Sequence, residues 1–336
     1  MITAANAYIC VCTYRRPGPL TELLASLRAQ ELGAAGEPGD AGEPGESGQP
    51  GEPGEPGEPG QLSKPPLPQL IVVDNSPEGD AEAQVRAQYP SAHYLHEPRP
   101  GIAAARNAAV EAVPADAEAV LFLDDDERAA PHWLRTMIDC ANESGADTVS
   151  GPVITHFGAD PPEWLQASGF IRRTDFPTGP WGLRAATNNV LVRAHWFTSA
   201  GYRFDEAFSF IGGEDSDLFG RMLAAGARSW WCAEAQVEED LPAERLSPAW
   251  MRQRGIRAGH VRATKLIRRA EQDRPTPTLR LRIAVEGIGR LGYGVARTAA
   301  RRLKRAPVRY VDSVYHREGL GMLQAAAGRR YEEYGR

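Results

Sequence analysis

The sequence predicts an α/β protein with a mostly parallel central sheet that is covered by helices on both faces. Short apolar runs that are typical of buried strands alternate along the first 150 residues with segments whose apolar residues recur at helical spacing. Strands that alternate with helices in this way form parallel sheets, because each crossover helix packs on one face of the sheet.

The strands are predicted from apolar runs that end in polar residues, namely 7–13 (AYICVCT), 69–75 (QLIVVDN), 91–97 (SAHYLHE) and 119–127 (AVLFLDDDE). The helices are predicted at 19–30, 81–90, 101–113 and 131–144. The first of them places Leu20, Leu23, Leu24 and Leu27 at helical spacing. The last one opens with Pro131, which we expect in the first helical turn because proline needs no hydrogen-bond partner there.

A collagen-like glycine repeat interrupts this pattern. Every third residue from Gly33 to Gly60 is glycine, and most triplets carry glutamate or proline. The repeat and the proline-rich segment after it form an insertion, 33–68, between the first helix and the second strand. A triple helix would need three chains in register and would set like charges side by side, so we expect a disordered acidic polyproline-type loop. Helix-to-strand loops lie at the sheet edge away from the ligand site.

The net charge of −6 conceals two parts of opposite sign. From Arg245 to the C-terminus the chain has 22 Lys and Arg against 7 Asp and Glu, so the preceding part is strongly acidic. We expect a domain at 1–260 and a basic amphipathic region at 261–336. A cationic segment attracts phosphate, lipid or nucleic acid. A nucleic-acid partner is not expected, because the tail has no aromatic-interleaved surface or known binding motif.

The cysteines indicate a reducing compartment. Cys10 and Cys12 share one face of the first predicted strand, while Cys140 and Cys232 are isolated. A metal site at the first pair lacks a second Cys or His cluster, so core thiols are expected. No basic segment with an apolar run follows Met1, and no apolar run is long enough to span a bilayer. These features predict a cytoplasmic protein.

The first acidic motif is FLDDDE (122–127), where carboxylates follow a buried strand at the edge that binds ligands. If the strand continues, Asp124 and Asp126 share a direction and Asp125 is opposed. Two hard oxygen ligands at this spacing suit Mg²⁺ or Mn²⁺ on a diphosphate. An acidic turn that caps the next helix explains the motif equally well.

The second acidic motif is IGGEDSDLFGR (211–221). Gly212 and Gly213 precede Glu214, Asp215 and Asp217 at the start of a predicted helix. Carboxylates in a first turn commonly stabilise the helix dipole. A general base also needs a carboxylate on a fixed element that faces a cleft, and the glycines leave room for substrate. The motif alone favours neither interpretation.

Taken together, these motifs resemble family 2 glycosyltransferases, which have the Rossmann-like GT-A fold. The matching passages are VCTYRRP (11–17), VVDNS (72–76), GIAAARNAA (101–109), FLDDDE (122–127), TNNVLVRAHWF (187–197) and FDEAFSFIGGEDSDLFGR (204–221). They occur in the family's order, and the resemblance covers residues 7–260. The segment 237–259 is similar to enzymes that build succinoglycan-type exopolysaccharides.

The resemblance implies an inverting transfer from a nucleotide-diphosphate sugar, with UDP as the expected nucleotide and Mn²⁺ or Mg²⁺ as the metal. The implied acceptor is a saccharide or a polyprenyl-diphosphate-linked glycan in exopolysaccharide or cell-surface glycan synthesis. The donor-binding roles fall on Thr13, Tyr14, Arg15, Asp74, Arg106, Asp124 and Asp125, with Asn188 and Asn189 at the donor–acceptor boundary. Asp126 and Asp124 are the implied metal ligands, Asp215 is the implied base, and Glu214 lies beside it.

Two departures from the family pattern refine this expectation. The Q-x-x-R-W signature of processive members is replaced by MRQRGIR (251–257), and membrane spans are absent, so single-sugar addition is expected. Family members often have a late histidine metal ligand. Here AQVEED offers Glu238 or Glu239 at that place, which leaves the third metal ligand open.

The basic tail contains two predicted helical segments. Ser247 and Pro248 are a suitable cap and first residue for the first one. Its arginines at 252, 254 and 257 could close over a diphosphate or form a solvated face.

Farther on, apolar residues follow helical spacing at 281, 284, 285, 288, 291, 295 and 299, with arginines at 290, 297 and 301 on another face. This pattern suits the anionic cytoplasmic surface of the inner membrane, or a helix packed on the domain. Glycines at 287, 289, 292 and 294 weaken the helix prediction.

Other classes of protein remain possible on the sequence. A nucleotidyltransferase shares an α/β nucleotide site with paired acids, but it would lack the GGEDSDLFGR segment and would release diphosphate rather than a nucleoside diphosphate. A collagen-like oligomerisation or display protein would be a trimer with a cooperative polyproline-type melting transition. An oligomer formed through the repeat is compatible with either an enzyme or a display protein.

Overall fold

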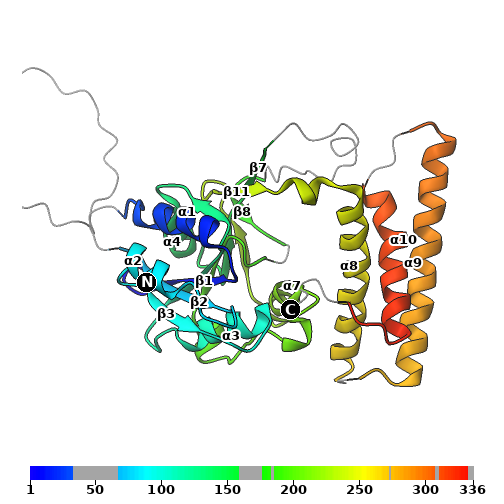
Figure 1. The fold of residues 1–336 in the computed structure, drawn as a ribbon, viewed down its shortest axis with the longest axis horizontal. Helices are drawn as coiled ribbons and strands as arrows, with labels where there is room; N and C mark the ends of the chain where they lie inside the picture. The colour runs from blue at the N-terminus through cyan, green and yellow to red at the C-terminus, as the bar shows by residue number, and fades with distance from the viewer. Residues whose placement is uncertain (33–66, 159–175, 183–184, 272–273, 307–309, 332–336) are drawn as a thin grey trace, which may run out of the picture.

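The computed structural model describes residues 1–32, 67–158, 176–182, 185–271, 274–306 and 310–331 (Figure 1). Within these residues the main sheet has eight strands: β1 (Ala7–Thr13), β2 (Gln69–Asp74), β3 (His93–His96), β4 (Ala119–Asp124), β6 (Thr148–Ser150), β8 (Gly179–Pro180), β9 (Val190–Arg193) and β10 (Ser229–Trp231). Their order across the sheet is β3-β2-β1-β4-β9-β6-β10-β8. The predicted α/β class is confirmed.

The first half of the sheet is parallel, as predicted. β1 lies between β2 and β4 and is parallel to both, and β3 is parallel to β2. Thr13 pairs with Asp74, and Cys12 pairs with Asp124, so the polar residues that follow these strands meet at one edge. β9 runs antiparallel to β4 and β6, and it was not among the strands that the apolar runs predict.

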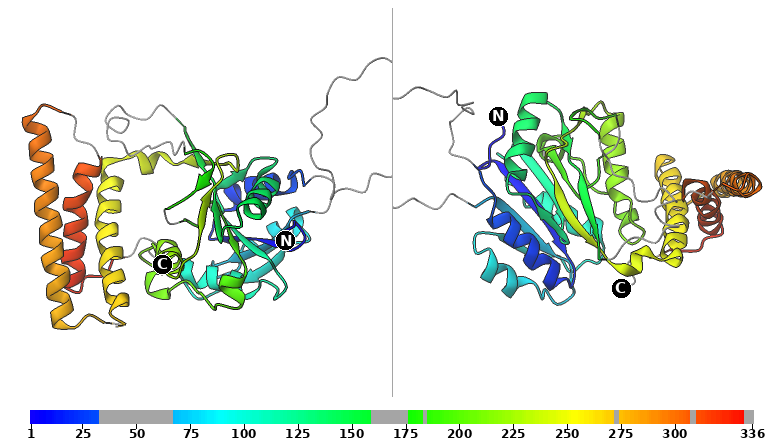
Figure 2. Two further views of the ribbon diagram at one scale, coloured as in Figure 1. Left: turned by 180° about the vertical axis from the view of Figure 1, so that it is seen from behind. Right: turned by 90° about the horizontal axis from the view of Figure 1, so that it is seen from above.

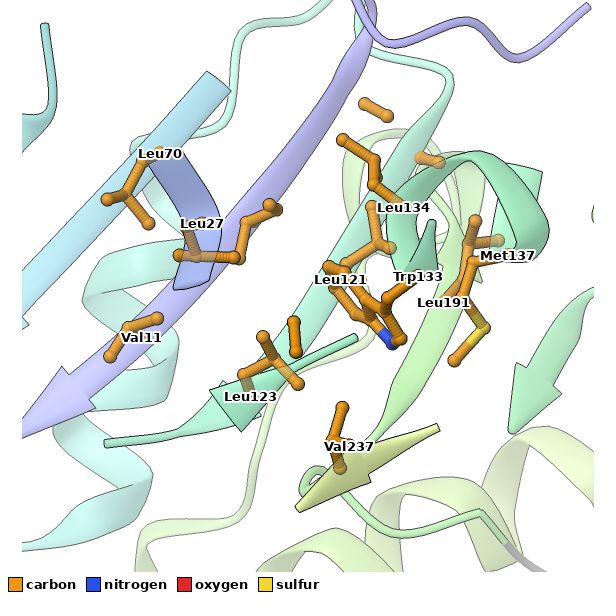
Figure 3. Packing of buried hydrophobic residues seen from close by; sticks show 14 of the residues in the cluster. Val11, Leu27, Leu70, Leu121, Leu123, Trp133, Leu134, Met137, Leu191 and Val237 are labelled. Atoms are coloured by element: carbon orange, nitrogen blue, oxygen red, sulfur yellow. The ribbon is translucent and has the colours of Figure 1, made fainter. Parts of the chain in front are cut away.

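Helices cover both faces of the sheet. One face carries α1 (Pro17–Arg28), α2 (Glu82–Gln88) and α4 (Trp133–Ser144), and the other carries α3 (Ile102–Glu111), α6 (His195–Thr198) and α7 (Glu214–Ala224). Successive strand residues alternate between the two cores: Ile9 and Val11 pack in the first, and Cys10 packs in the second. Figure 3 shows the first core, where Trp133 and Met137 of α4 lie over Leu191.

Several predicted boundaries shift by a few residues. α1 begins at Pro17 rather than at 19, because proline fits the first helical position. α4 begins at Trp133, so Pro131 lies in the turn before the helix rather than in its first turn. The run 119–127 divides, since β4 ends at Asp124 and a turn separates it from β5 (Glu127–Ala129).

A smaller sheet extends from this turn. β5 pairs with β11 (Val237–Leu241), which also pairs with β7 (Val153–Phe157), in the order β5-β11-β7. The register sets Glu239 between Glu127 on one side and Thr155 on the other. The acidic strand β11 therefore lies next to the turn that follows β4.

The C-terminal region consists of α8 (Pro248–Arg269), α9 (Pro277–Leu303) and α10 (Tyr310–Ala326). The hydroxyl of Ser247 accepts the Trp250 N–H at 3.2 Å, which confirms the predicted helix start. α8 continues through residue 260, so the boundary that we expected between 260 and 261 falls inside a helix. The three helices lie in one layer, with α10 between α8 and α9 and with α8 nearest to the sheet (Figures 1 and 2).

Glycine allows these helices to approach closely. A Cβ atom on Gly294 of α9 would overlap the backbone of His316 in α10, and one on Gly259 of α8 would overlap the backbone of Glu318. The glycines that weaken the helix prediction for α9 are thus partly explained by packing against α10. None of the helices in the described part of the chain is long and apolar enough to cross a membrane.

Of the predicted insertion, 33–68, residues 33–66 lie outside the described residues, so its predicted conformation stays a prediction. Its attachment points are described. α1 ends at Arg28 and β2 begins at Gln69, while Leu32 and Leu67 pack against the first core. Both ends lie at the sheet edge opposite to the C-terminal ends of β1, β2 and β4.

We expect the repeat to be dispensable for activity. Replacing residues 34–61 with a short Gly-Ser turn should leave the thermal unfolding midpoint and the turnover close to those of the intact chain, because both attachment points are far from the opposite sheet edge. Calorimetry, a turnover assay and sizing chromatography test this. A folded but inactive variant of unchanged oligomeric state would show that the insertion reaches the active site.

Candidate active site

A cleft of about 820 Å³ opens at the edge of the sheet where β4 ends. Asp124 of β4 and Arg106 of α3 line its floor, and Glu214 and Asp215 at the start of α7 line one side. Residues of α8 complete the lining beside the start of α7. Ligands of α/β sheets bind at this edge, so the structure brings the two acidic motifs together where a ligand site is expected.

The guanidinium of Arg106 connects the two acidic motifs. One of its nitrogens, Nη2, donates to Asp124 Oδ1 at 3.1 Å, and the other, Nη1, donates to Glu214 Oε1. The side chains of Arg106 and Glu214 are 9% and 4% exposed. Burial alone would lower the pKa of Arg106, but the two carboxylates more than offset this effect and raise it. Arg106 is therefore a permanent cation at the cleft floor.

The two carboxylates at the start of α7 have different environments. Glu214 is buried, and burial raises its pKa to about 6 although Arg106 opposes the shift. Asp215 is only half-buried and lines the cleft, where it accepts the N–H of Ser216 at 2.5 Å. Glu214 is thus held by Arg106, whereas Asp215 faces the space that a ligand would fill.

Two glycines shape the approach to this helix. Gly212 and Gly213 have φ angles of +73° and +87°, in the left-handed region that glycine adopts without strain. A side chain at Gly213 would also collide with Val261 of α8. The pair therefore permits α8 to pack on the first turn of α7, and it keeps the backbone before Asp215 open to the cleft.

The DDD run does not follow the direction rule expected of a continuing strand. Because β4 ends at Asp124, Asp125 and Asp126 lie in a turn, and the rule fails there. Asp124 faces Arg106, and Asp125 turns into the interior. The carboxylates of Asp125 and Asp126 both accept from Arg16 Nη1, at 3.0 and 2.7 Å. The two carboxylates of the turn thus pair with one arginine, and they do not cap the next helix, which begins at Trp133.

Arg16 is a site residue that the sequence did not single out. It precedes α1 and reaches the turn from 110 positions away in the chain. Thr13 Oγ1 also donates to Asp125 Oδ2, at 2.8 Å. Burial raises the pKa of Asp125 to about 6, and Arg16 and Thr13 oppose this. The TYRRP segment after β1 offered two adjacent arginines, and only the fold distinguishes Arg16 from its exposed neighbour.

Glu127 stabilises the same turn through a hydrogen bond to the backbone at the end of β4. Its Oε2 accepts the backbone N–H of Asp124 at 2.8 Å, while its Oε1 has no partner in the structure. The residue is 1% exposed, and burial raises its pKa well above the usual value, with Asp124 adding to the effect. Glu127 therefore fixes the backbone at the end of β4.

The predicted nucleotide residues at the tips of β1 and β2 divide into two groups. Asp74 is buried and accepts from the N–H groups of Ser76 and Ala81, both at 2.8 Å, so it shapes the loop after β2. Tyr14 and Arg15 are accessible, and Arg15 forms an exposed ion pair with Glu78 at 2.7 Å. Only this second group offers side chains to an incoming ligand.

Asn188 and Asn189 also differ. Asn188 lines the cleft. Asn189 is 2% exposed, and its amide accepts from Trp133 Nε1 at 2.8 Å and donates to the carbonyls of Pro152 and Ala235 at 3.1 and 2.8 Å. Its side chain joins the small sheet to the main one, and it is fully used in structural hydrogen bonds.

α8 gives the cleft a cationic side. Among the arginines predicted to meet a diphosphate, Arg254 and Arg257 line the cleft, whereas Arg252 is exposed and lies outside its lining. Lys265 Nζ donates to Ser216 Oγ at 2.7 Å, next to Asp215. Further charged residues of the lining that the sequence did not single out are Arg245, Arg262 and Glu318.

The carboxylates of the cleft that could bind a metal ion do not form one cluster. Of the two glutamates proposed at the third ligand position, Glu239 lines the cleft and accepts from Thr155 Oγ1 at 2.7 Å, while Glu238 is exposed near His156. Among the described residues, no three His, Cys, Asp or Glu side chains are grouped closely enough to hold a metal ion. Of the two expected metal ligands, Asp124 lines the cleft, and Asp126 pairs with Arg16 in the turn that follows β4.

Comparisons with known proteins agree with this geometry. A family model described as glycosyl transferase family 2 matches residues 60–205. Over 334 residues the chain is 30% identical to the succinoglycan biosynthesis protein ExoM of Rhizobium meliloti (strain 1021). The alignment covers 97% of this chain and 95% of that protein. The family model includes the first acidic motif, and the alignment to the succinoglycan protein extends over 97% of the chain.

One solved structure supports the fold over almost the whole chain. The structure of S. aureus TarS 1–349 in complex with UDP aligns with a TM-score of 0.50 and 16% identity, over 97% of this chain and 93% of that chain. A longer S. aureus TarS structure, of which this chain spans 41%, aligns over 82% of this chain with a TM-score of 0.49 and 16% identity. The predicted GT-A fold is confirmed, and at this identity the likeness shows the fold alone.

The two neighbouring asparagines should behave differently when replaced. Asn189→Ala leaves the Trp133 indole N–H without its acceptor and removes the side-chain hydrogen bonds to the carbonyls of Pro152 and Ala235, so the free energy of unfolding should fall by about 2–4 kcal/mol. Asn188→Ala removes a side chain at the cleft and should change it by less than about 0.5 kcal/mol. Urea denaturation of both variants tests this, and equal losses in the two would contradict the assignment.

Proposed function

Because the chain belongs to glycosyl transferase family 2 and is therefore a glycosyltransferase, we propose that it transfers one sugar from a UDP-sugar to a glycan acceptor with inversion at the anomeric carbon. The observation that carries this proposal is the Arg106 bridge. It sets the end of β4, where a donor diphosphate is expected, against the start of α7, where a base is expected.

The donor nucleotide is proposed to lie over the tips of β1 and β2. Tyr14 and Arg15 are accessible there and would contact it directly. Thr13, Asp74 and Asp125 are buried and would act through the shape of the loops that they hold. The complex of TarS with UDP, whose fold aligns with almost the whole chain, supports UDP as the nucleotide.

A divalent cation fits the end of β4 if the donor supplies several of its ligands. Mg²⁺ commonly binds to one or two carboxylates together with phosphate oxygens and water, and Asp124 and Asp126 provide two such carboxylates. Mn²⁺ takes the same oxygen ligands. We propose that these two residues hold the metal, with Glu239 as the third candidate from the cleft. When bound, the metal neutralises negative charge on the leaving diphosphate.

Asp215 is the proposed general base. An acceptor hydroxyl would give its proton to the Asp215 carboxylate while its oxygen bonds to the anomeric carbon. The bond from that carbon to the diphosphate breaks on the opposite side, and the electron pair leaves with UDP. Glu214 is already engaged by Arg106 and is proposed to position this cation. Arg254 and Arg257 of α8, which also line the cleft, are proposed to attract the diphosphate.

The acceptor is proposed to be a saccharide, free or linked to polyprenyl diphosphate, in the synthesis of an exopolysaccharide or cell-surface glycan. The identity to the succinoglycan biosynthesis protein over most of both chains supports this substrate class. A lipid-linked acceptor would place the reaction at the cytoplasmic face of the inner membrane. Addition of a single sugar follows from the missing Q-x-x-R-W signature.

A panel of nucleotide sugars tests the proposal as a whole. The chain should release UDP from one UDP-sugar when a glycan acceptor is present, and the product should have the inverted anomeric configuration by NMR. Release of pyrophosphate instead of UDP would indicate a nucleotidyltransferase. Release of another nucleoside diphosphate would retain the reaction class and overturn the choice of nucleotide.

Asp215→Asn should abolish base catalysis without affecting the donor site. Turnover should fall by about 10²–10⁴-fold, because an amide cannot accept the hydroxyl proton, while the affinity for UDP should stay within about twofold. Asp217→Asn is the matched control in the same helical turn, where Asp217 pairs with Arg221 at 2.8 Å, and it should keep near-normal turnover. Near-normal turnover of Asp215→Asn would transfer the role to Glu214 or Asp217.

Asp126→Ala should weaken metal-dependent donor binding and turnover together. Calorimetry with UDP in the presence and absence of Mn²⁺ should show a metal-dependent gain in affinity for the wild type that is lost in the variant. Asp139→Ala, which removes an exposed carboxylate of α4, is the control and should retain the gain. A metal-dependent gain that survives Asp126→Ala would exclude Asp126 as a ligand.

A further inference from the structure

The outermost helix of the chain, α9, has an uncovered apolar face. Leu281, Val285, Ile288 and Val295 are 64%, 60%, 61% and 53% exposed, and Leu303 at the end of the helix is 86% exposed. Their spacing of three and four residues, continued by Gly292 and Ala299, aligns them on one side of the helix. We call this set the outer face of α9.

The opposite side of α9 makes the contacts that hold the helix in place. Ile283, Gly287 and Gly294 are buried, and both glycines lie against the backbone or side chains of α10. Figure 2 shows α9 at the end of the helical layer, with α10 separating it from α8. The apolar outer face is thus on the side away from its packing partners, and neither α8 nor α10 covers it.

The charges beside the outer face are of one sign. Arg280, Arg282 and Arg302 are exposed on α9. Glu286, the one acidic residue of this helix, faces the bundle, where it accepts from Arg262 Nε at 2.5 Å and from Arg290 Nε at 3.4 Å. Among the residues whose side chains the structure describes, the outer face therefore has exposed apolar side chains with arginines beside them, and no carboxylate.

A groove continues the apolar surface at the C-terminal end of the helix. It has a volume of about 660 Å³ and is lined by Val295, Thr298, Ala299, Arg302, Leu303 and His316. Val295, Ala299 and Leu303 thus belong to both the outer face and the groove. The apolar surface is wider at this end than a single row of side chains.

We propose that the outer face of α9 docks the protein on a bilayer that contains anionic phospholipids. Apolar side chains along one side of a helix enter the headgroup boundary, and arginines beside them attract anionic headgroups. A second copy of this chain fits less well, because two identical faces would bring the arginines of both copies together without any carboxylate to pair with them. The inference goes beyond the proposed reaction, since the residues of this face lie outside the cleft lining.

Sedimentation of the full chain with vesicles tests the proposal without any assay of activity. The protein should bind vesicles of phosphatidylcholine mixed with phosphatidylglycerol, bind vesicles of phosphatidylcholine alone much less, and lose binding as the salt concentration rises. Val285→Ser with Ile288→Ser should weaken binding to the anionic vesicles by about tenfold or more. Arg282→Gln with Arg302→Gln should weaken it by about tenfold, with a shallower salt dependence.

Matched controls separate docking from general effects on the protein. Leu223→Ser removes an exposed apolar side chain from α7, and Arg135→Gln removes an exposed arginine from α4; both should bind vesicles like the wild type. Circular dichroism should show the same helix content in all variants. Absent binding, equal binding to both kinds of vesicle, or a lipid-free dimer that Val285→Ser with Ile288→Ser converts to monomer would overturn the proposal.

Discussion

One buried cation determines the geometry of the cleft. Arg106 comes from α3, and its guanidinium bonds to both the end of β4 and the start of α7. Its partner on α7, Glu214, lies 108 positions away in the chain. Removing one partner from a buried ion pair leaves an uncompensated charge, at a cost of about 3–5 kcal/mol. The positions of both acidic motifs therefore depend on one side chain, and Asp215 owes its place at the cleft to the residue that precedes it.

The rest of the cleft follows from where the chain returns to this centre. The parallel strands bring polar loops to one edge, and Arg16 and Glu127 hold the DDD turn in place from two directions. α8 then adds arginines and a lysine to the lining of the same cleft. The cleft therefore has cations from α8 and Arg106 beside the carboxylate of Asp215, which Arg106 does not engage.

The sequence was informative where local pattern and fold agree. Apolar runs located the parallel strands and the DDD motif at the end of one of them, and the carboxylates after Gly212 and Gly213 located the second motif. These signals lie within a few neighbouring residues. Contacts between segments that are far apart in the chain could not be predicted from the sequence. Arg15 and Arg16 are adjacent and chemically identical, and Asn188 and Asn189 differ only in which side of the backbone they occupy. The end of β4 at Asp124 also changed the expected grouping, since the turn lets Asp125 and Asp126 share one partner, Arg16. The predicted role of each residue in binding or catalysis remains a prediction.

The glycine contacts in the C-terminal layer have a mechanical consequence. Where Gly259 meets α10 from one side and Gly294 meets it from the other, backbone lies directly on backbone. Side chains between helices ordinarily adjust their rotamers and absorb small displacements, and at these positions there are none to do so. The helices α8, α9 and α10 should therefore move together as one rigid body. Any force on α9 would then be transmitted through α10 to α8, and from α8 to the start of α7, against which it packs at Gly213.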